Sequence, residues 1–500
     1  MMSHKKNIVQ SGAGKKPGRF IEIVNTLEGL ITAFIMAFVI ITFVVQSFVI
    51  PTGSMADTLR GDHYRLRCSQ CGYQYEHNFS PERRRAMIDT RCPSCGFFQS
   101  ISGKDKPVKG DKILVLKCVY QFFDPKRWDV VVFKNPTEPR INYIKRLVAL
   151  PGETVEIIDG DVYINGRIVR KPPKVQDELW MPVYDNDYQP ARKNDRRFNG
   201  HYWRQPFRME SPKWYVNPDV PTVFHLQSGD NQQHYLVYDS SRGNDFRAAY
   251  AYDSVHTYRY MPYCSDLMIR FYITPHQSKG SIGASLSKYG IRYDARVDFA
   301  GRMVITRKAG ENDVEQLAVR QIVEAPQNYA TLFTFANVDH QLILRFGGQT
   351  LSYDLGLGAD DAGRRRNDIQ PEVAIFACGQ LSISHTAVFR DIHYMGTDMG
   401  MTQHCRAGQD SPFKLNADEF FMLGDNSPGS KDSRWWDTDG IGNNGLTYRQ
   451  GVVPREYLLG RAFFVYWPSG FKPFEGFFGI IPNVGRMRII DSGSNSTLLP

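Results

Sequence analysis

The longest uncharged apolar run of the chain lies near its N-terminus, where residues 29–50 read GLITAFIMAFVIITFVVQSFVI. A helix of about 20 apolar residues is long enough to cross the hydrocarbon core of a bilayer, which is about 30 Å thick. The run therefore predicts a transmembrane helix over residues 29–50. A cleaved secretory signal is the alternative, but the apolar part of such a signal is only about 7 to 15 residues long.

Basic residues before this run predict its orientation, because an excess of Lys and Arg marks the cytoplasmic flank of a membrane helix. They are Lys5, Lys6, Lys15, Lys16 and Arg19. We therefore expect residues 1–28 to form a cytoplasmic N-terminal segment. We expect a single-pass protein of the cytoplasmic (inner) membrane, with everything after residue 50 outside the cytoplasm.

The chain has a formal net charge of +9, which is compatible with an anionic partner. Its Lys and Arg residues are scattered, and the expected topology keeps them away from nucleic acid. We therefore expect no nucleic-acid partner. Membrane lipids are the expected partner, because their anionic headgroups attract basic groups.

Short β-branched runs bounded by turn residues follow the apolar run and predict antiparallel strands. They include KILVLK, WDVVVFKN and YIKRLVAL, and the pair Asn165-Gly166 in DVYINGRIV is a strong hairpin signal. A longer, differently composed region contains DLMIRFYIT, in which Leu267, Ile269 and Phe271 occupy alternate positions. Similar patterns in RMVITR and TLFTFANVDHQLILRF predict an inserted β-sandwich.

One predicted strand carries a lysine on its apolar face. In INYIKRLVAL, period two places Tyr143, Lys145 and Leu147 on one face and Arg146 on the other. Burial disfavours the charged form of a lysine and lowers its pKa, and a neutral lysine is able to act as a general base. From this strand alone, the alternative is a lysine that extends to solvent or pairs with an acid.

A serine in a glycine-containing turn follows the apolar run directly, in the segment PTGSMADTL. A serine hydroxyl is a weak nucleophile until a base takes its proton, and a Ser-Lys pair is one known solution. Gly53 permits a tight turn before Ser54, and Thr52 supplies a second hydroxyl. Ser54 is therefore a candidate nucleophile next to the membrane surface, with Lys145 as its candidate base.

These segments resemble the motif series of bacterial type I signal peptidases, the membrane serine proteases that remove signal peptides. The resemblance is carried in chain order by PTGSMADTL, GDKILVLK, YIKRLVALPGE, FFMLGDNSPGSKDSR and GRAFFVYWP. It implies a leader peptidase of serine protease family S26, which cleaves the signal peptides of exported preproteins at the outer face of the cytoplasmic membrane. The alternative is a catalytically inactive relative that acts as a glycan- or protein-binding module.

The resemblance also implies roles for the residues of a Ser-Lys dyad. Ser54 would be the nucleophile and Lys145 the general base. Thr52, through its hydroxyl, and Ser54, through its backbone N–H, would form the oxyanion hole, whose donors stabilise the charge of a tetrahedral intermediate. No cofactor is expected for catalysis.

Further residues match supporting positions of the family. Ser430 matches a serine that hydrogen-bonds and orients the lysine, and Asp432 and Arg434 match an ion pair that braces the site. Tyr143 and Arg146 belong to the lysine strand and complete the supporting set.

The chain departs from the family pattern at two places. Asp57 stands where a proline usually precedes Thr-Leu, and Ser427-Pro428-Gly429 replaces the usual Arg-Asp-Asn. Neither change removes a group with an implied catalytic role, but the second affects the loop before Ser430.

Four cysteines form two CxxCG-aromatic motifs, and they are Cys68, Cys71, Cys92 and Cys95. Four thiolates in this spacing suit a tetrahedral structural zinc site, which resembles a zinc ribbon. Two disulfides are the alternative, because the expected location is outside the cytoplasm. The remaining cysteines have no ligand spacing, and the sequence leaves their pairing open: Cys118, Cys264, Cys378 and Cys405.

The fold class that we expect is mainly β. An N-terminal transmembrane helix precedes an antiparallel β catalytic domain, which is interrupted by a zinc-ribbon-like module and by a sandwich similar to concanavalin-like or laminin-G-like jelly rolls. The expected catalytic parts are residues 51–67, 104–173 and 411–500, and the expected insertions are residues 68–103 and 174–410. The sequence assigns no ligand to the sandwich and no oligomeric state to the chain.

Overall fold

The computed structural model describes residues 19–81, 88–101, 105–192, 198, 202–253, 255–310, 313–356, 369–396, 405–442, 445–468, 470 and 483–493. The lysines expected to mark the cytoplasmic flank, Lys5, Lys6, Lys15 and Lys16, lie outside the described residues. Within them the structure is mainly β and has one long helix at its N-terminal end. The expected fold class is therefore confirmed.

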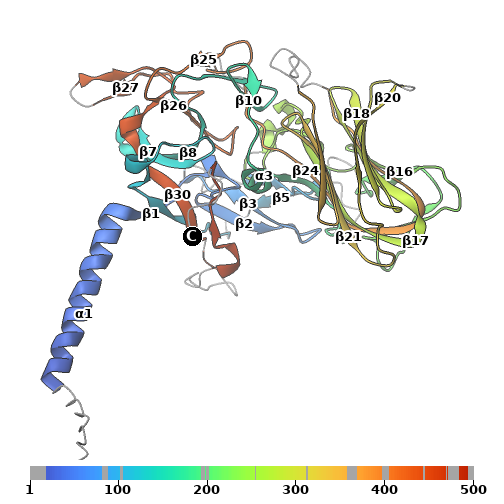
Figure 1. The fold of residues 1–500 in the computed structure, drawn as a ribbon, viewed down its shortest axis with the longest axis horizontal. Coiled ribbons are helices and arrows are strands. Elements are labelled where there is room, and N and C mark those ends of the chain that lie inside the picture. The colour runs from blue at the N-terminus through green and yellow to red at the C-terminus, as the bar shows by residue number, and fades with distance from the viewer. Residues whose placement is uncertain are drawn as a thin grey trace, which may run out of the picture.

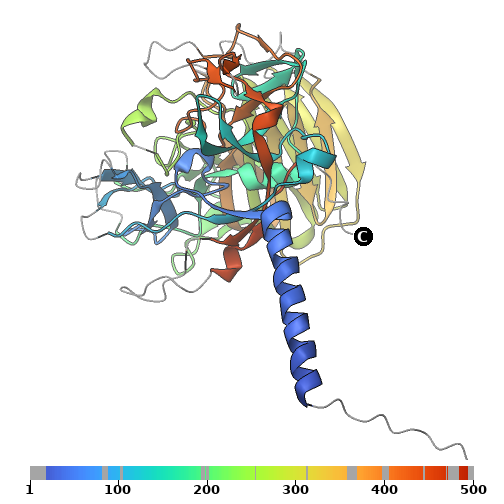
Figure 2. The ribbon, with the colours of Figure 1, turned by 90° about the vertical axis from the view of Figure 1, so that its left-hand side faces the viewer.

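The long helix, α1, spans Arg19–Val39, and a π-helical turn, η1, extends it over Ile40–Val44. It projects away from the rest of the molecule (Figures 1 and 2). Residues Glu22–Val44 are long and apolar enough to cross a membrane, judged by length and composition. The large apolar side chains of this segment are exposed, as expected of a helix that has no protein neighbour to cover it.

The apolar run does not stay helical to residue 50, which corrects the expected span. Val45–Val49 form strand β1, which pairs antiparallel with β6, Lys112–Leu116. The run VVQSFV is rich in β-branched residues and contains two polar ones, a composition that suits an edge strand better than a membrane helix. The segment before the serine turn is therefore anchored in the sheet.

An eight-stranded antiparallel sheet contains the strands predicted in KILVLK, WDVVVFKN and YIKRLVAL, and its main path runs β1-β6-β30-β7-β8-β26-β29. The other members are β7 (Val130–Asn135), β8 (Glu138–Ala149), β26 (Glu419–Leu423), β29 (Val453–Pro454), β30 (Leu458–Trp467) and β31 (Arg488–Ile489), which pairs with β30. Segments from both ends of the chain thus form one sheet. Short helix α2 (Val119–Phe122) lies between β6 and β7 in the chain.

A four-stranded sheet follows the order β11-β10-β9-β25. Its strands are β9 (Thr154–Ile158), β10 (Asp161–Ile164), β11 (Arg167–Ile168) and β25 (Phe413–Lys414). Asn165 and Gly166 join β10 to β11 with φ values of 51° and 75°. These left-handed conformations are those that an Asn-Gly hairpin turn requires, so the predicted hairpin is confirmed.

The inserted sandwich is built around two long antiparallel strands, β17 (Leu267–Lys288) and β24 (Val373–Arg390). Their register is interrupted between Pro275 and Gly280. The first half of β17 also pairs with β21 (Thr331–Val338), and its second half pairs with β18 (Ile291–Asp298). The two long strands therefore form the centre of the sandwich, and β17 pairs with different neighbours along its two halves (Figure 1).

Shorter strands complete the sandwich. They are β12 (Met181–Asp185), β13 (Phe207–Met209), β14 (Trp214–Val216), β15 (Phe224–Gln227), β16 (His234–Tyr238), β19 (Arg302–Lys308), β20 (Val314–Gln321), β22 (Gln341–Phe346) and β23 (Gln349–Asp354). Helix α3 (Pro173–Leu179) connects β11 of the four-stranded sheet to β12.

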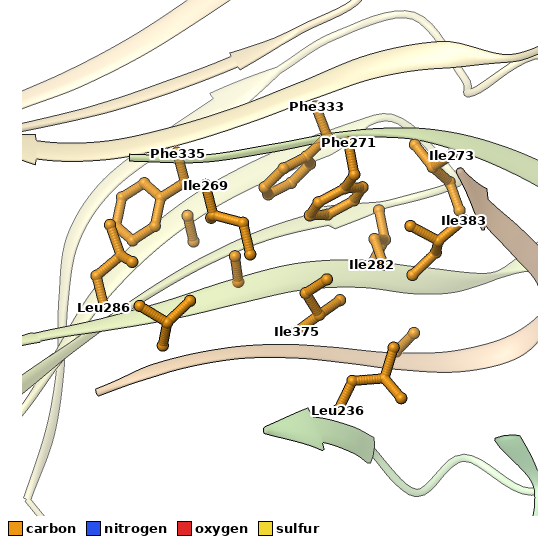
Figure 3. Packing of buried hydrophobic residues seen from close by; sticks show 14 of the residues in the cluster. Leu236, Ile269, Phe271, Ile273, Ile282, Leu286, Phe333, Phe335, Ile375 and Ile383 are labelled. Carbon is orange, nitrogen blue, oxygen red and sulfur yellow. The ribbon is translucent and has the colours of Figure 1, made fainter. Parts of the chain in front are cut away.

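The sandwich core confirms the alternation read in DLMIRFYIT. Leu267, Ile269, Phe271 and Ile273 are all buried in it. Figure 3 shows Phe271 and Phe333 facing one another, and their rings stack with centroids 4.7 Å apart. The region therefore has its own hydrophobic core, separate from that of the eight-stranded sheet.

Buried ion pairs link the sandwich to the four-stranded sheet. Lys288 of β17 pairs with Asp266 and lies 3.7 Å from a carboxylate oxygen of Asp161 in β10. Lys171 pairs with Asp339 at 2.5 Å. Asp161, Asp266 and Asp339 lie close enough together to hold a metal ion by geometry, but the ammonium groups of Lys171 and Lys288 already pair with these carboxylates.

The four-cysteine module consists of two hairpins, β2–β3 and β4–β5. Their strands are His63–Arg67, Gln74–Asn78, Ile88–Arg91 and Phe98–Ile101. Each CxxC motif lies at the turn between the strands of one hairpin, in a small core of its own.

Candidate active site

Ser54 lies in a single 3-10 turn, η2, over Gly53–Met55. The preceding Thr52 is extended, with φ −121° and ψ 157°, and Met55 is fully buried. Ile50 is also buried, and its N–H donates to the carbonyl of Asp111 at 2.9 Å. The turn is therefore tied to the sheet within four residues of the serine.

Lys145 projects from β8 toward this turn. Its Nζ donates to Ser54 Oγ at 2.6 Å and to the carbonyl of Ile144 at 3.0 Å. Only 4% of the residue is exposed. Burial lowers the pKa of Lys145 to about 8, against the opposing effect of Asp432 and Asp425. The structure thus brings the two residues of the expected dyad into direct contact.

Tyr143, two residues earlier on the same strand, lies beside the lysine. Lys145 Nζ is 5.3 Å from the centroid of its ring. The ring also packs against Phe133 and Trp436. Tyr143 therefore forms part of the aromatic wall near the buried amine.

Arg146, on the opposite face of β8, is fully buried and pairs with Asp425. Its Nε donates to Asp425 Oδ1 at 2.8 Å, its Nη2 donates to Oδ2 at 2.7 Å, and its Nη1 donates to the carbonyl of Trp128. The sequence interpretation assigned no role to Asp425, although it lies in the quoted segment GDNSPGSKDSR. Charge was the signal in the sequence that could have identified Asp425. Arg146 and Arg434 both need buried partners, and Asp432 supplies only one.

Asp432 and Arg434 form the ion pair that the resemblance implied. Arg434 Nε donates to Asp432 Oδ1 at 2.8 Å, and Arg434 Nη2 donates to Oδ2 at 2.7 Å. Arg434 also donates to the Oγ and the carbonyl of Ser427. The departure at Ser427 therefore leaves this pair intact, since its serine supplies acceptors to the arginine.

Ser430 does not make the hydrogen bond that we expected. Its Oγ is buried and has no hydrogen-bond partner among the described residues. A Cβ placed on Gly424 would lie 2.2 Å from this Oγ and 2.5 Å from the carbonyl oxygen of Ser54, so the serine lies near the turn. Lys145 Nζ instead donates to Ser54 Oγ and Ile144.

Thr52, the other expected oxyanion-hole residue, is exposed and its side chain does not cap the 3-10 turn. Asp57, which replaces the family proline, is partly buried, and desolvation raises the pKa of its carboxyl. Asn426, which the sequence interpretation did not single out, donates from its backbone N–H to the carbonyl of Ser54 at 3.1 Å.

The four cysteines of the two motifs come together as a separate cluster, and three of them are buried. Cys68 Sγ lies 3.6 Å from Cys95 Sγ, and Cys71 Sγ lies 3.6 Å from Cys92 Sγ. Sulfurs at the corners of a tetrahedron about 2.3 Å from zinc are roughly 3.7 Å apart, whereas a disulfide bond is about 2.05 Å long. The geometry therefore fits four thiolate ligands of one metal ion better than two disulfides.

Similarity to known protein families agrees with the resemblance seen in the sequence motifs. The family model "Signal peptidase, peptidase S26" matches residues 97–232 and 379–467, on both sides of a long part of the sandwich. Over these two parts the chain matches the signal peptidase family. The interruption of the match agrees with a signal-peptidase fold that carries an inserted β-sandwich.

The curated relatives of this chain have modest identity to it. Signal peptidase I of Pseudomonas aeruginosa is 45% identical over 87 residues, which are 14% of this chain and 31% of the relative. Signal peptidase I of Rickettsia prowazekii is 29% identical over 217 residues, which are 42% of this chain and 68% of the relative. Probable signal peptidase I-2 of Synechocystis is 32% identical over 111 residues, which are 19% of this chain and 47% of the relative. The chain thus spans less than half the length of two of these three relatives.

Solved structures with some similarity include the carbohydrate binding module CBM66 from Bacillus subtilis and galectin LEC-6 from Caenorhabditis elegans. The first is 7% identical, with a TM-score of 0.22, and covers 37% of this chain and 93% of its own. The second is 11% identical, with a TM-score of 0.19, and covers 26% of this chain and 87% of its own. TM-scores this low support no inference about the sandwich.

Proposed function

We propose that this chain is an active, membrane-anchored serine endopeptidase of the signal peptidase family, which removes signal peptides from exported preproteins. The observation that carries the proposal is the 2.6 Å contact between Ser54 Oγ and the buried Nζ of Lys145. Among the comparisons, the family match supports the substrate class.

The proposed reaction begins when neutral Lys145 takes the proton of the Ser54 hydroxyl as its oxygen attacks the scissile carbonyl. The tetrahedral intermediate collapses to an ester on Ser54, and the lysine ammonium gives its proton to the departing amine. Water then attacks the ester, and Lys145 takes a proton from that water and gives it to Ser54 Oγ as the ester bond breaks. This restores the serine hydroxyl and the neutral lysine, and it frees the signal peptide with a new C-terminal carboxyl group. The Ser54 backbone N–H and the Thr52 hydroxyl are the proposed donors to the oxyanion.

We propose that α1 is a membrane anchor rather than a cleaved signal. Strand β1 directly continues the helical segment and pairs with β6, so the apolar run is joined to the sheet that carries the site. An anchor of this kind would keep Ser54 at the outer membrane surface, where the end of a signal peptide leaves the bilayer. The expected division into an interrupted catalytic domain with two insertions belongs to the same proposal.

We also propose that the four cysteines hold a structural zinc ion. All four ligands would come from the protein, which leaves no position for a reacting water. Such an ion would stabilise the module of two short hairpins, whose core is small.

The experiment that tests the function is cleavage of a purified preprotein by the detergent-solubilised full chain. We expect the wild type to release the mature protein and the Ser54→Ala variant to leave the preprotein intact. Equal processing by both proteins would contradict the nucleophile assignment. Absence of processing by both would favour the inactive, binding relative.

A further inference from the structure

The inserted sandwich sends one segment, residues 249–253, directly to the serine turn. Tyr252 in this segment is buried. A Cβ placed on Gly53 would lie 2.1 Å from Cε1 of Tyr252, so the aromatic ring lies against the glycine that precedes the nucleophile. This segment comes from the insertion, yet it contacts the turn that carries the candidate nucleophile.

The neighbouring Asp253 reaches the same turn through one amide side chain. Asn426 Nδ2 donates to Asp253 Oδ1 at 2.8 Å and to the carbonyl of Gly53 at 3.2 Å. The backbone N–H of Asn426 donates to the carbonyl of Ser54 at 3.1 Å. Asn426 therefore holds two consecutive carbonyls of the serine turn, and Asp253 is the other acceptor of its side-chain amide.

Asp253 helps to fix which way this amide faces, together with the backbone N–H of Gly429, which donates to Asn426 Oδ1 at 3.4 Å. An ionised carboxylate only accepts hydrogen bonds, whereas an asparagine amide has a donor end and an acceptor end. With its NH₂ group directed at Asp253, Asn426 also directs that group at the Gly53 carbonyl. The reversed amide would place an oxygen against both acceptors, so the carboxylate disfavours it.

The 249–253 segment is itself fixed on its other side. The backbone N–H of Asn78 in β3 donates to the carbonyl of Tyr252 at 3.0 Å. Tyr250 donates from its hydroxyl to the carbonyl of Asp425 at 3.1 Å, and Arg390 at the end of β24 donates to the carbonyl of Ala249. The segment is thus held by the four-cysteine module, by the sandwich and by Asp425.

We propose that Asp253 is a positioning residue of the signal-peptide cleavage reaction. Through Asn426 it holds the Gly53–Ser54 peptide so that Ser54 Oγ stays in contact with Lys145 and the Ser54 N–H keeps its direction toward the substrate carbonyl. The inserted sandwich is therefore part of the framework of the active site. This inference rests on the proposed function, because positioning matters only if Ser54 is the nucleophile.

The first test compares Asp253→Ala with Asp253→Asn and with Asp294→Ala. Asp294 also accepts side-chain hydrogen bonds, from Ser285 and Arg292, but these lie within strands β17 and β18 of the sandwich. We expect Asp253→Ala to lower kcat for preprotein cleavage about tenfold, with KM within twofold of wild type. Asp253→Asn retains an acceptor and should recover most of kcat, and Asp294→Ala should leave kcat unchanged.

A second variant separates positioning from folding. In the exchange Asp253→Asn/Asn426→Asp, residue 253 can donate to residue 426, so the pair keeps a hydrogen bond. Residue 426 then has no side-chain donor for the Gly53 carbonyl. We expect its thermal unfolding midpoint to lie close to that of wild type, while kcat falls at least tenfold.

The outcomes are distinguishable when wild type and Ser54→Ala are measured in the same assay. Equal processing by these two overturns the proposed function. An active wild type, together with wild-type kcat in both Asp253→Ala and the exchange variant, overturns the positioning role alone. Loss of kcat in Asp253→Ala that is matched by an equal loss in Asp294→Ala also overturns it, because the effect would then come from general damage to the sandwich.

Discussion

Asp425 holds Arg146 by two charged hydrogen bonds at a place where neither side chain is exposed. Arg146 follows Lys145 directly in β8 and projects from the opposite face. The pair therefore connects the lysine strand to the segment Gly424–Asp425–Asn426, and the carboxylate of Asp425 compensates the charge of the buried guanidinium.

The first prediction concerns this pair. Asp425→Ala should lower the free energy of unfolding in urea by about 3 to 5 kcal/mol, because it leaves a buried guanidinium without its counter-ion. The matched control is Glu315→Ala, which breaks the exposed Arg307–Glu315 pair and should cost no more than about 1 kcal/mol. Equal losses in the two variants would contradict the prediction. Arg146→Met combined with Asp425→Leu should recover part of the stability.

The second prediction is the pH dependence of cleavage. Burial lowers the pKa of Lys145 to about 8, so the lysine is mostly charged below that pH and mostly neutral above it. Since the proposed base is the neutral amine, kcat/KM should rise with pH and level off above about 8. Lys145→Arg should be inactive at every pH, because arginine keeps its proton. A flat profile from pH 6.5 to 9 in the wild type would argue against a lysine base.

Periodicity predicted much of the fold because it reports local geometry. The alternation around Lys145 correctly indicated burial, and Asn165-Gly166 correctly indicated a hairpin, since both depend on residues adjacent in the chain. The apolar run was harder to divide. Hydropathy does not distinguish a membrane helix from a buried or edge strand at its end, and the pairing partner of Val45–Val49 lies more than 60 residues away.

The candidate site shows the same limit. Motif order brought Ser54 and Lys145 together, and the structure places them in contact. The hydrogen bond expected for Ser430 is absent among the described residues, because a motif gives residue types without the distances between them. The contacts of Asp253 and Tyr252 depend on how an insertion folds back onto residue 53, and no pattern in the sequence reports that.

The third prediction concerns the four cysteines. Protein purified without chelators should contain about one zinc ion per chain by elemental analysis, and mass spectrometry should find no disulfide among Cys68, Cys71, Cys92 and Cys95. Cys92→Ser should lose the metal and unfold at lower temperature, because one of four ligands is removed. Cys378→Ser, outside the cluster, should keep it. Two mapped disulfides and no metal would establish the alternative.

The fourth prediction concerns the close approach of the Tyr252 ring to Gly53 in the serine turn. Gly53→Ala adds a methyl group where the Tyr252 ring already lies, at 2.1 Å from the ideal Cβ position, so either the ring or the turn must shift. Because Tyr252 is buried and the turn carries the nucleophile, we expect kcat to fall at least tenfold, with a smaller effect on KM. The control is Gly229→Ala, at an exposed glycine whose added Cβ meets no atom within 4 Å, and it should cleave at the wild-type rate. Gly53→Ala combined with Tyr252→Ala makes room for the methyl group and should regain activity relative to Gly53→Ala, as measured by preprotein cleavage. Full activity in the single Gly53→Ala variant would show that this close approach does not position Ser54.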